Sequence, residues 1–289
     1  MLAIIYFIAS CFFFACLSAT GKYMSLEMHP AMIVFFRNVI ELLIVIPIVY
    51  IHKKDIKKHF TSKMLWSRGF MSQFASTCWF IGISKVSLPT AMAFSFSTPL
   101  FTTITAMLFL KETISYRRAT ALIVGFMGVL LILKPDGEIF DIAPYGWIFG
   151  TVLIWALTNI VIKKLSDSVR PFVIIFYMAL TMTIFSLPLA LFYWQLPKLE
   201  QLPLLFVAAI TTLLWQWCII KAFNKSQITV LQPFEFSKLI FACIIGYVLF
   251  DEVLSISGWF GVTLIIVSST YVTWREHKIK KKSLNTPLP

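Results

Sequence analysis

The sequence predicts an all-α membrane protein in which ten transmembrane helices form two inverted five-helix repeats, with both termini in the cytoplasm. Three observations lead to this fold class. Hydrophobic residues make up 59% of the chain and charged residues only 13%, whereas a soluble domain carries roughly 25% charge. Apolar stretches follow one another along the whole chain, and prolines and a glutamate recur at a fixed offset.

The apolar stretches predict ten membrane spans, because a bilayer core needs roughly 20 apolar residues per helix. The first stretch lacks the basic start and the small-residue cleavage site of a signal peptide, so we expect it to be a helix. In chain order, the predicted spans are 2–21, 30–51, 66–84, 87–110, 118–134, 143–162, 171–194, 202–221, 227–250 and 256–274.

A repeat of about 140 residues underlies the two predicted units. Two prolines and a glutamate recur after 140 or 141 residues: Pro30, Pro47 and Glu112 are matched by Pro171, Pro188 and Glu252. The sequence therefore predicts a first repeat (1–140), a second repeat (141–274) and a basic cytoplasmic tail (275–289). Each repeat holds an odd number of spans, so the second must enter the bilayer from the opposite side. Inverted repeats of this kind are typical of alternating-access transporters.

Lys and Arg are distributed unevenly between the two sides of the membrane. With the N-terminus inside, nineteen of the 25 Lys and Arg residues fall in interior segments, four in exterior segments and two within spans. Because interior loops carry the positive excess, this bias predicts a multi-pass membrane protein with cytoplasmic N- and C-termini. The net charge of +12 then faces an anionic leaflet, so nucleic acid is not an expected partner.

The chain carries none of the sequence patterns that mark common enzymes and metal sites. The five cysteines all fall within predicted spans and show no CxxC or Cys–His spacing. No HExxH, GxSxG or P-loop pattern occurs. We therefore expect no enzymatic activity, no cofactor and no metal, and we expect the lipid bilayer and a small-molecule substrate as partners.

Four ionisable residues are expected deep within spans. Arg37 and Glu41 are four residues apart, and Glu235 and Lys238 three apart, so each pair shares one helix face. A charge at the bilayer centre costs roughly 2.5–3.5 kcal/mol on insertion scales, so such residues are candidates for function. Two interpretations remain open. The pairs either hold helices together, or one charge of each pair faces a central cavity and meets a charged or zwitterionic substrate.

Polar and aromatic residues at comparable depth complete the predicted substrate site. Each could instead pack or bridge helices, but together they would suit a flat or heteroaromatic metabolite. These further candidates are Gln73, Trp79, Phe94, Ser97, Trp155, Asn159, Tyr177, Trp215 and Gln216.

Prolines and glycines within spans predict where helices bend and pack. A proline removes one backbone hydrogen bond and kinks a helix, which suits either a moving hinge or a static bend. The predicted hinges are Pro47, Pro99, Pro188 and Pro233. Closely spaced glycines in spans 118–134 and 256–274 allow close helix approach, so these spans are expected to serve packing or a homodimer face, the alternative being a monomer.

Together these features resemble the EamA type of the drug/metabolite transporter superfamily, in which Glu112 and Glu252 would close matching spans. The resemblance implies an inner-membrane carrier whose cavity excludes spans 118–134 and 256–274. Four stretches are similar to rickettsial-type S-adenosylmethionine uptake transporters: VFFRN (34–38), AFSFSTPLFTTITAMLFLKE (93–112), IIFYMALTMTIFSLPLALFYW (174–194) and the start of the ninth span around Pro233.

One departure from that pattern concerns the ninth span. In those carriers a basic residue follows the proline and an acidic one comes three residues later, whereas here Glu235 precedes Lys238. We expect a secondary transporter of a small polar metabolite, with S-adenosylmethionine uptake, in exchange for S-adenosylhomocysteine, as the favoured reaction. The alternatives are an antiporter that exports amino acids or drugs, coupled to protons, and a membrane subunit that transports nothing.

Overall fold

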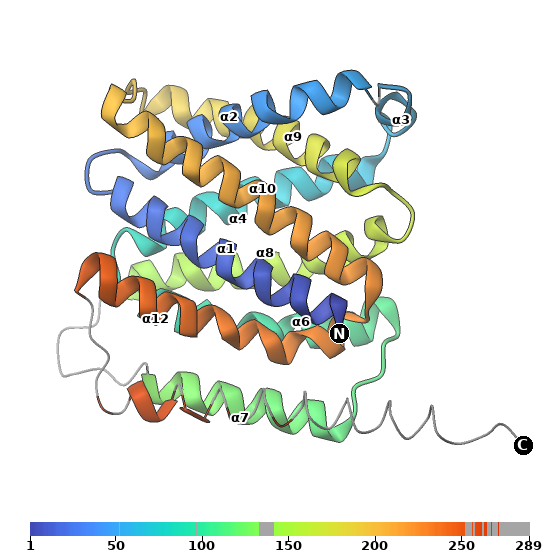
Figure 1. Ribbon diagram of the computed structural model, residues 1–289, viewed down its shortest axis with the longest axis vertical. Helices are drawn as coiled ribbons and strands as arrows, with labels where there is room; N and C mark the ends of the chain where they lie inside the picture. Colours follow the sequence, from blue (N-terminus) through green and yellow to red (C-terminus); the bar gives the residue numbers. More distant parts are fainter. Residues whose placement is uncertain are drawn as a thin grey trace, which may run out of the picture.

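The computed structural model describes residues 1–51, 53–95, 97–132 and 142–251, together with residues 256, 258–261, 263, 264, 267 and 271. Every regular element in these residues is helical, and the helices form one bundle of mostly antiparallel neighbours (Figure 1). The elements are α1 (Leu2–Met24), α2 (Pro30–Ile51), α3 (Lys53–Lys58), α4 (Lys63–Ile83), α5 (Leu88–Ser95), α6 (Ser97–Leu110), α7 (Tyr116–Ile132), α8 (Ile142–Ser166), α9 (Pro171–Phe192), η1 (Leu199–Gln201), α10 (Leu202–Lys225), α11 (Ile228–Leu231), η2 (Gln232–Phe236) and α12 (Ser237–Phe250).

Six helical segments within the described residues are long and apolar enough to cross a membrane. They are Leu2–Met24, Pro30–Pro47, Ala143–Ser166, Pro171–Phe192, Leu199–Lys225 and Ile228–Phe250. Three further predicted spans coincide with α4, with α5 and α6, and with α7, which are shorter or more polar. The predicted span 256–274, the loop 135–141, Glu252 and the tail 275–289 lie largely or wholly outside the described residues. The all-helical membrane fold is confirmed, whereas the count of ten spans stays a prediction.

The repeat seen in the sequence has a counterpart in the helices. The helices α2 and α9 both contain 22 residues, and α6 and α12 both contain 14. The residue after each of the latter two helices is left-handed, with φ of 55° at Lys111 and 53° at Asp251, which is a common way to end a helix. These matching lengths and ends favour the predicted repeats.

The packing is paired in the same way. The contact of α1 with α10 has its counterpart in that of α8 with α4, and α1 lies along α12 as α8 lies along α6. The matched helices α2 and α9 pack on each other. Two units related by a two-fold axis would make these contacts in pairs, so the packing favours an inverted repeat, which stays a prediction.

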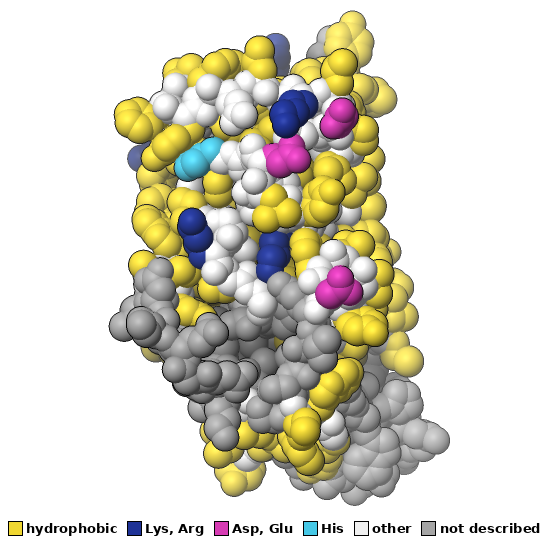
Figure 2. Space-filling view, turned by 90° about the vertical axis from the view of Figure 1, so that its left-hand side faces the viewer, with side chains coloured by type: hydrophobic (Ala, Val, Ile, Leu, Met, Phe, Trp, Pro, Cys, Tyr) yellow, Lys and Arg dark blue, Asp and Glu magenta, His cyan; other side chains and the backbone are white. Residues whose placement is uncertain are grey.

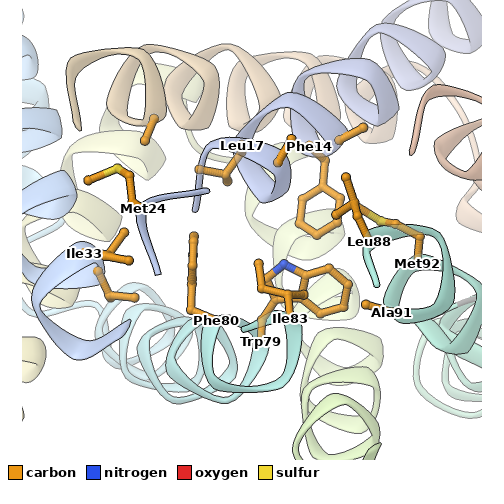
Figure 3. Packing of buried hydrophobic residues seen from close by; sticks show 14 of the residues in the cluster. Phe14, Leu17, Met24, Ile33, Trp79, Phe80, Ile83, Leu88, Ala91 and Met92 are labelled. Atoms are coloured by element: carbon orange, nitrogen blue, oxygen red, sulfur yellow. The ribbon is translucent and has the colours of Figure 1, made fainter. Parts of the chain in front are cut away.

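Two apolar clusters fill opposite halves of the bundle. The first, which includes Phe14, Leu17 and Trp79, lies toward the end where α1 stops and α2 begins. Figure 3 shows Phe14 and Leu17 facing the side chains of α4 in this cluster. The second includes Phe7, Leu65 and Phe223 and lies toward the end that holds the N-terminus. Buried polar residues occupy the level between the two clusters, and this level contains the candidate site.

Close helix contacts at glycines hold α4 in place. A Cβ atom at Gly69 would lie 1.6 Å from Oγ1 of Thr181 on α9, and one at Gly21 of α1 would lie 1.8 Å from the ring of Phe80. Only glycine fits at such distances, so α4 lies unusually near both neighbours. This close approach fixes the depth of the polar residues on α4.

The surface of the bundle is apolar on its sides and charged at its ends. Leu108 and Phe109 of α6 and Val248 and Leu249 of α12 are all more than half exposed. Figure 2 shows the end on the left of Figure 1, where charged and polar side chains lie in the middle and hydrophobic ones along the border. This distribution is what a membrane-spanning bundle requires, because its sides meet lipid and its ends meet water.

Candidate functional site

A small cavity lies between the two apolar clusters. Its volume is about 50 Å³, which suits a few water molecules and is far below the roughly 300–1,000 Å³ of ligand pockets. Its described lining comes from α1, α2, α4, α6, α8, α9, α10, η2 and α12, and none of it from α7. The structure is therefore closed around the candidate site, and a metabolite could enter only if helices separate.

Arg37 of α2 contacts both its neighbour Asn38 and side chains of α4. The guanidinium is 2% exposed, and its Nη2 donates to Asn38 Oδ1 at 2.7 Å and Ser76 Oγ at 3.4 Å. Its Cζ lies 5.6 Å from the centroid of the Phe80 ring, within cation–π range. The polar side chains of α4 and the Phe80 ring thus hold this buried cation.

Glu41 also has a partner on another helix. Its Oε1 accepts a hydrogen bond of 2.7 Å from Gln216 Nε2 of α10, and its charge interacts electrostatically with both Arg37 and Arg68. The four-residue spacing allows a direct ion pair between Arg37 and Glu41, but none is formed among the described residues. Their hydrogen bonds go instead to Asn38, Ser76 and Gln216.

Glu235 and Lys238 form the ion pair that their spacing predicts. Lys238 Nζ contacts Glu235 Oε1, and both side chains are buried. Glu235 lies in the 3₁₀ segment η2, which contains Pro233, and Lys238 lies in the first turn of α12. Lys238 Nζ also lies 4.8 Å from the centroid of the Phe14 ring. The ninth predicted span thus neutralises its own charges beside the cavity.

Arg68 of α4 is a cavity residue that the sequence reasoning assigned to the interior surface. It is 2% exposed and lines the cavity with Ser72, Ser76 and Trp79. In the described part of the protein, neither Nε nor Nη1 has a hydrogen-bond partner. The four residues are spaced by four, four and three, which places them on one helix face. That pattern is the signal that could have revealed the site.

Four aromatic rings from four segments border the cavity. The centroid of Phe14 lies 5.4 Å from that of Trp79 and 5.1 Å from those of Trp155 and Trp215. Trp79 Nε1 donates to Ser18 at 3.1 Å, whereas Trp215 Nε1 is buried without a partner among the described residues. This aromatic cluster gives the cavity a polarisable wall next to its charges.

The remaining predicted site residues are divided between the cavity and other places. Asn159 lines the cavity and donates to Thr102 at 3.3 Å. Tyr177 lies outside the lining and donates its hydroxyl to the backbone oxygen of Ile56 at 2.8 Å. Ser97 is also outside the lining, which contains the neighbouring Thr98 instead. The side chain of Phe94 lies outside the described set.

Gln73 lies in a second, wider hollow. Its amide accepts from Asn38 and donates to Thr77, both at 3.1 Å. The hollow has a volume of about 1160 Å³ and is bounded by the loop after α1, by α4 and by α9. It begins near the mid-depth polar level and reaches the end of the bundle at His29. Gln73 therefore lies between this hollow and the cavity side of α4.

The predicted hinge prolines occupy different helix positions. Pro47 and Pro188 lie inside α2 and α9, where each removes a backbone hydrogen bond. Pro99 is in the first turn of α6, where a missing N–H has little effect. Pro233 is the second residue of the 3₁₀ segment that carries Glu235. The regular α-helical hydrogen bonding of the backbone is thus interrupted at Pro47 of α2, at Pro188 of α9 and at Pro233 of η2.

Polar contacts close both ends of the bundle. At the end that holds α3, Arg170 pairs with Asp55 at 2.9 Å, and Glu112 accepts from the backbone N–H groups of Ile228 at 3.2 Å and Thr229 at 3.0 Å. At the other end, Glu27 accepts from Lys198 at 3.3 Å and from Gln201 at 3.1 Å. Each set of contacts would have to break before the cavity could open to that side.

The comparisons with known proteins settle the family. The profile of the EamA-like transporter family matches residues 1–134 and again residues 143–274. The chain belongs to the EamA-like transporter family. It is therefore a membrane transporter with a small-molecule substrate, as the resemblance in the sequence implied.

Relatives in this family carry two kinds of substrate in their names. The chain is 30% identical to the S-adenosylmethionine uptake transporter of Rickettsia bellii, over 91% of this chain and 90% of the relative. It is 28% identical to the riboflavin transporter of Vibrio cholerae, over 94% of this chain and 93% of the relative. A solved crystal structure with 12% identity shares the fold at a TM-score of 0.69, over 94% of this chain and 98% of that one.

Proposed function

We propose that this EamA-type protein is a secondary transporter of the cell inner membrane that takes up S-adenosylmethionine by alternating access. We further propose that S-adenosylhomocysteine is exchanged for it, and that both termini face the cytoplasm. The observation that carries the proposal is a buried cavity with charges of both signs next to an aromatic cluster.

The chemistry of S-adenosylmethionine fits this combination of groups. The compound carries a carboxylate, an ammonium, a sulfonium and a flat purine base. The described lining offers cationic side chains for the first, the carboxylate of Glu235 for the cationic groups, and the rings of Phe14, Trp79, Trp155 and Trp215 for the base and the sulfonium. The names of the rickettsial relatives support the same substrate.

Riboflavin is the second candidate, favoured by the aromatic cluster and by the Vibrio relative. Its flavin ring would stack on tryptophan, but the molecule carries no charge at neutral pH. Binding it would therefore leave the buried ionisable side chains without the charged partners that a zwitterion supplies. This difference in charge places S-adenosylmethionine first.

Alternating access fits a cavity that is closed toward both ends. The ion pair of Asp55 with Arg170 lies toward one end, and that of Glu27 with Lys198 lies toward the other. Both pairs are exposed, and exposed pairs contribute only about 0–1 kcal/mol. They are weak enough to open in turn, while Pro47 in α2 and Pro188 in α9 provide matched points of bending.

Uptake into proteoliposomes tests the proposal. Purified full-length protein is reconstituted, and entry of radiolabelled S-adenosylmethionine is compared with and without S-adenosylhomocysteine inside. We expect saturable uptake that internal S-adenosylhomocysteine stimulates several-fold, and unlabelled riboflavin should not compete. The Lys164→Gln variant should keep most of the uptake, since Lys164 is exposed and does not line the cavity.

Other outcomes would redirect the assignment. Uptake of riboflavin without uptake of S-adenosylmethionine would establish the second candidate. Efflux of amino acids driven by a proton gradient would establish an exporter. Folded protein that moves none of these compounds would contradict the proposed reaction.

A further inference from the structure

We infer that Arg68 binds the carboxylate, and Gln216 the ammonium, of a free α-amino-acid head group, and that this head group defines the substrate class. The inference deepens the proposed function and rests on it for the location of the site. It does not depend on S-adenosylmethionine itself being the substrate.

Among the described residues, Arg68 is the cavity cation with the most unused buried donors, two against one for Arg37. Both Nε and Nη1 are buried and have no hydrogen-bond partner among the described residues. Leaving a buried donor on a charged group unsatisfied is costly. A guanidinium presents its donors in a planar fork that matches a carboxylate. Arg68 therefore has the geometry and the unmet demand for one carboxylate from a ligand.

Arg37 and Lys238 are less suited to this role. Arg37 leaves Nε without a partner, but its Nη2 already donates to Asn38 and Ser76, and Lys238 is paired with Glu235. Arg68 is the cavity cation for which the described residues supply no such acceptor. The distribution of partners therefore singles out Arg68 as the carboxylate anchor.

Gln216 supplies the acceptor for the ammonium. Its Nε2 donates to Glu41, which only the NH₂ side of the amide can do, so the orientation of the amide is fixed. The opposite atom, Oε1, is buried, belongs to a cavity-lining residue and has no partner in the described structure. Glu41 thus acts as a positioning residue, because it turns the carbonyl of Gln216 away from itself.

Binding measurements on the full-length protein in nanodiscs test the inference by changing the ligand and the protein together. The ligands are S-adenosylhomocysteine and its decarboxylated analogue, which lacks only the carboxylate. The proteins are the wild type, Arg68→Gln, Arg68→Lys and the control Lys164→Gln, which changes an exposed residue outside the lining. Size-exclusion profiles and melting curves establish which variants are folded.

We expect wild type to bind the decarboxylated analogue about 10- to 100-fold more weakly, since hydrogen bonds to charged groups are worth about 1.5–3 kcal/mol. Arg68→Gln should bind S-adenosylhomocysteine more weakly by a similar factor and no longer distinguish the two ligands. Arg68→Lys should regain part of the discrimination, and Lys164→Gln should behave as wild type. If Arg68 had only a structural role, Arg68→Gln would weaken binding of both ligands by the same factor.

The result that overturns the inference is equal discrimination by wild type and Arg68→Gln. Equal binding of the two ligands by wild type alone would overturn it too, without any variant. If folded wild type does not bind S-adenosylhomocysteine, the proposed substrate fails. The same comparison is then made with amino acids and their matching amines. An amino acid that needs both its carboxylate and Arg68 upholds the inference, and the lack of any such compound overturns it.

Discussion

Glu41→Gln should destabilise the protein strongly, whereas Arg68→Gln should not. The Glu41 side chain is fully buried and interacts electrostatically with Arg37 and Arg68. The amide introduced by Glu41→Gln could still accept the hydrogen bond from Gln216, so the substitution removes the charge and little else. Two buried guanidinium groups would then share no carboxylate from α2.

The size of the effect follows from this imbalance. Removing one partner of a buried charge pair costs about 3–5 kcal/mol, and Glu41 serves two cations, so we expect the upper half of that range. A chain of this size loses about 2–4 °C of melting temperature per kcal/mol, which gives a decrease of about 8–20 °C. Arg68→Gln leaves one guanidinium facing one carboxylate, so its melting temperature should stay within about 2 °C of wild type or rise.

Thermal unfolding of the full-length protein in detergent, followed by tryptophan fluorescence, measures both variants. Glu27→Gln is the matched control, because it removes an exposed carboxylate whose ion pair with Lys198 contributes little. The reasoning is refuted if Arg68→Gln lowers the melting temperature as much as Glu41→Gln does. In that case the charge of Arg68 would be needed for stability, and Arg68 would not be a cation that lacks a partner in the folded protein.

Three further predictions concern the ends of the bundle. Glu112→Ala removes two charge-assisted hydrogen bonds to the start of α11, so the melting temperature should fall by about 1–8 °C, and an unchanged value would contradict the capping role. Burial lowers the pKa of His29, and its Nδ1 accepts a hydrogen bond from the Ala31 N–H, so the folded state favours the neutral imidazole. The stability that neutral His29 contributes is therefore lost as the pH falls below the ordinary His value of about 6.5. The drop in melting temperature from pH 7.5 to 5 should accordingly be smaller in His29→Phe than in wild type. In a cysteine-free background, Glu200→Cys should react with an impermeant thiol reagent added outside cells and Lys57→Cys only after lysis, and the reverse pattern would invert the proposed orientation.

Hydrophobicity and spacing were sufficient to predict the helices. The expected spans 30–51 and 171–194 correspond closely to α2 and α9, because long apolar runs after a proline leave few alternatives in a membrane. The same holds for the ion pair of Glu235 with Lys238, since residues three apart on a helix meet without help from another element.

Partners chosen by tertiary packing could not be predicted. Arg37 and Glu41 share a helix face, but which groups they contact depends on where α4 and α10 lie. Arg68 is buried because Gly69 lets α4 approach α9 closely, and no local pattern reports that distance. The sequence reasoning therefore named eight of the 22 described residues that line the cavity and missed Arg68, the cation with two unpartnered donors.

The two apolar clusters also bear on the ion gradients of the host cell. A carrier must let its solute cross without opening a path for protons or sodium ions. The charged side chains at mid-membrane would otherwise lower the barrier to the passage of these ions. Packed side chains around Phe14 and Trp79 on one side, and around Phe7 and Phe223 on the other, exclude water from both approaches to that level. Since an unhydrated ion pays several kcal/mol to enter such a region, each cluster acts as an electrical seal, and a carrier that loosens only one of them at a time leaves the membrane potential intact.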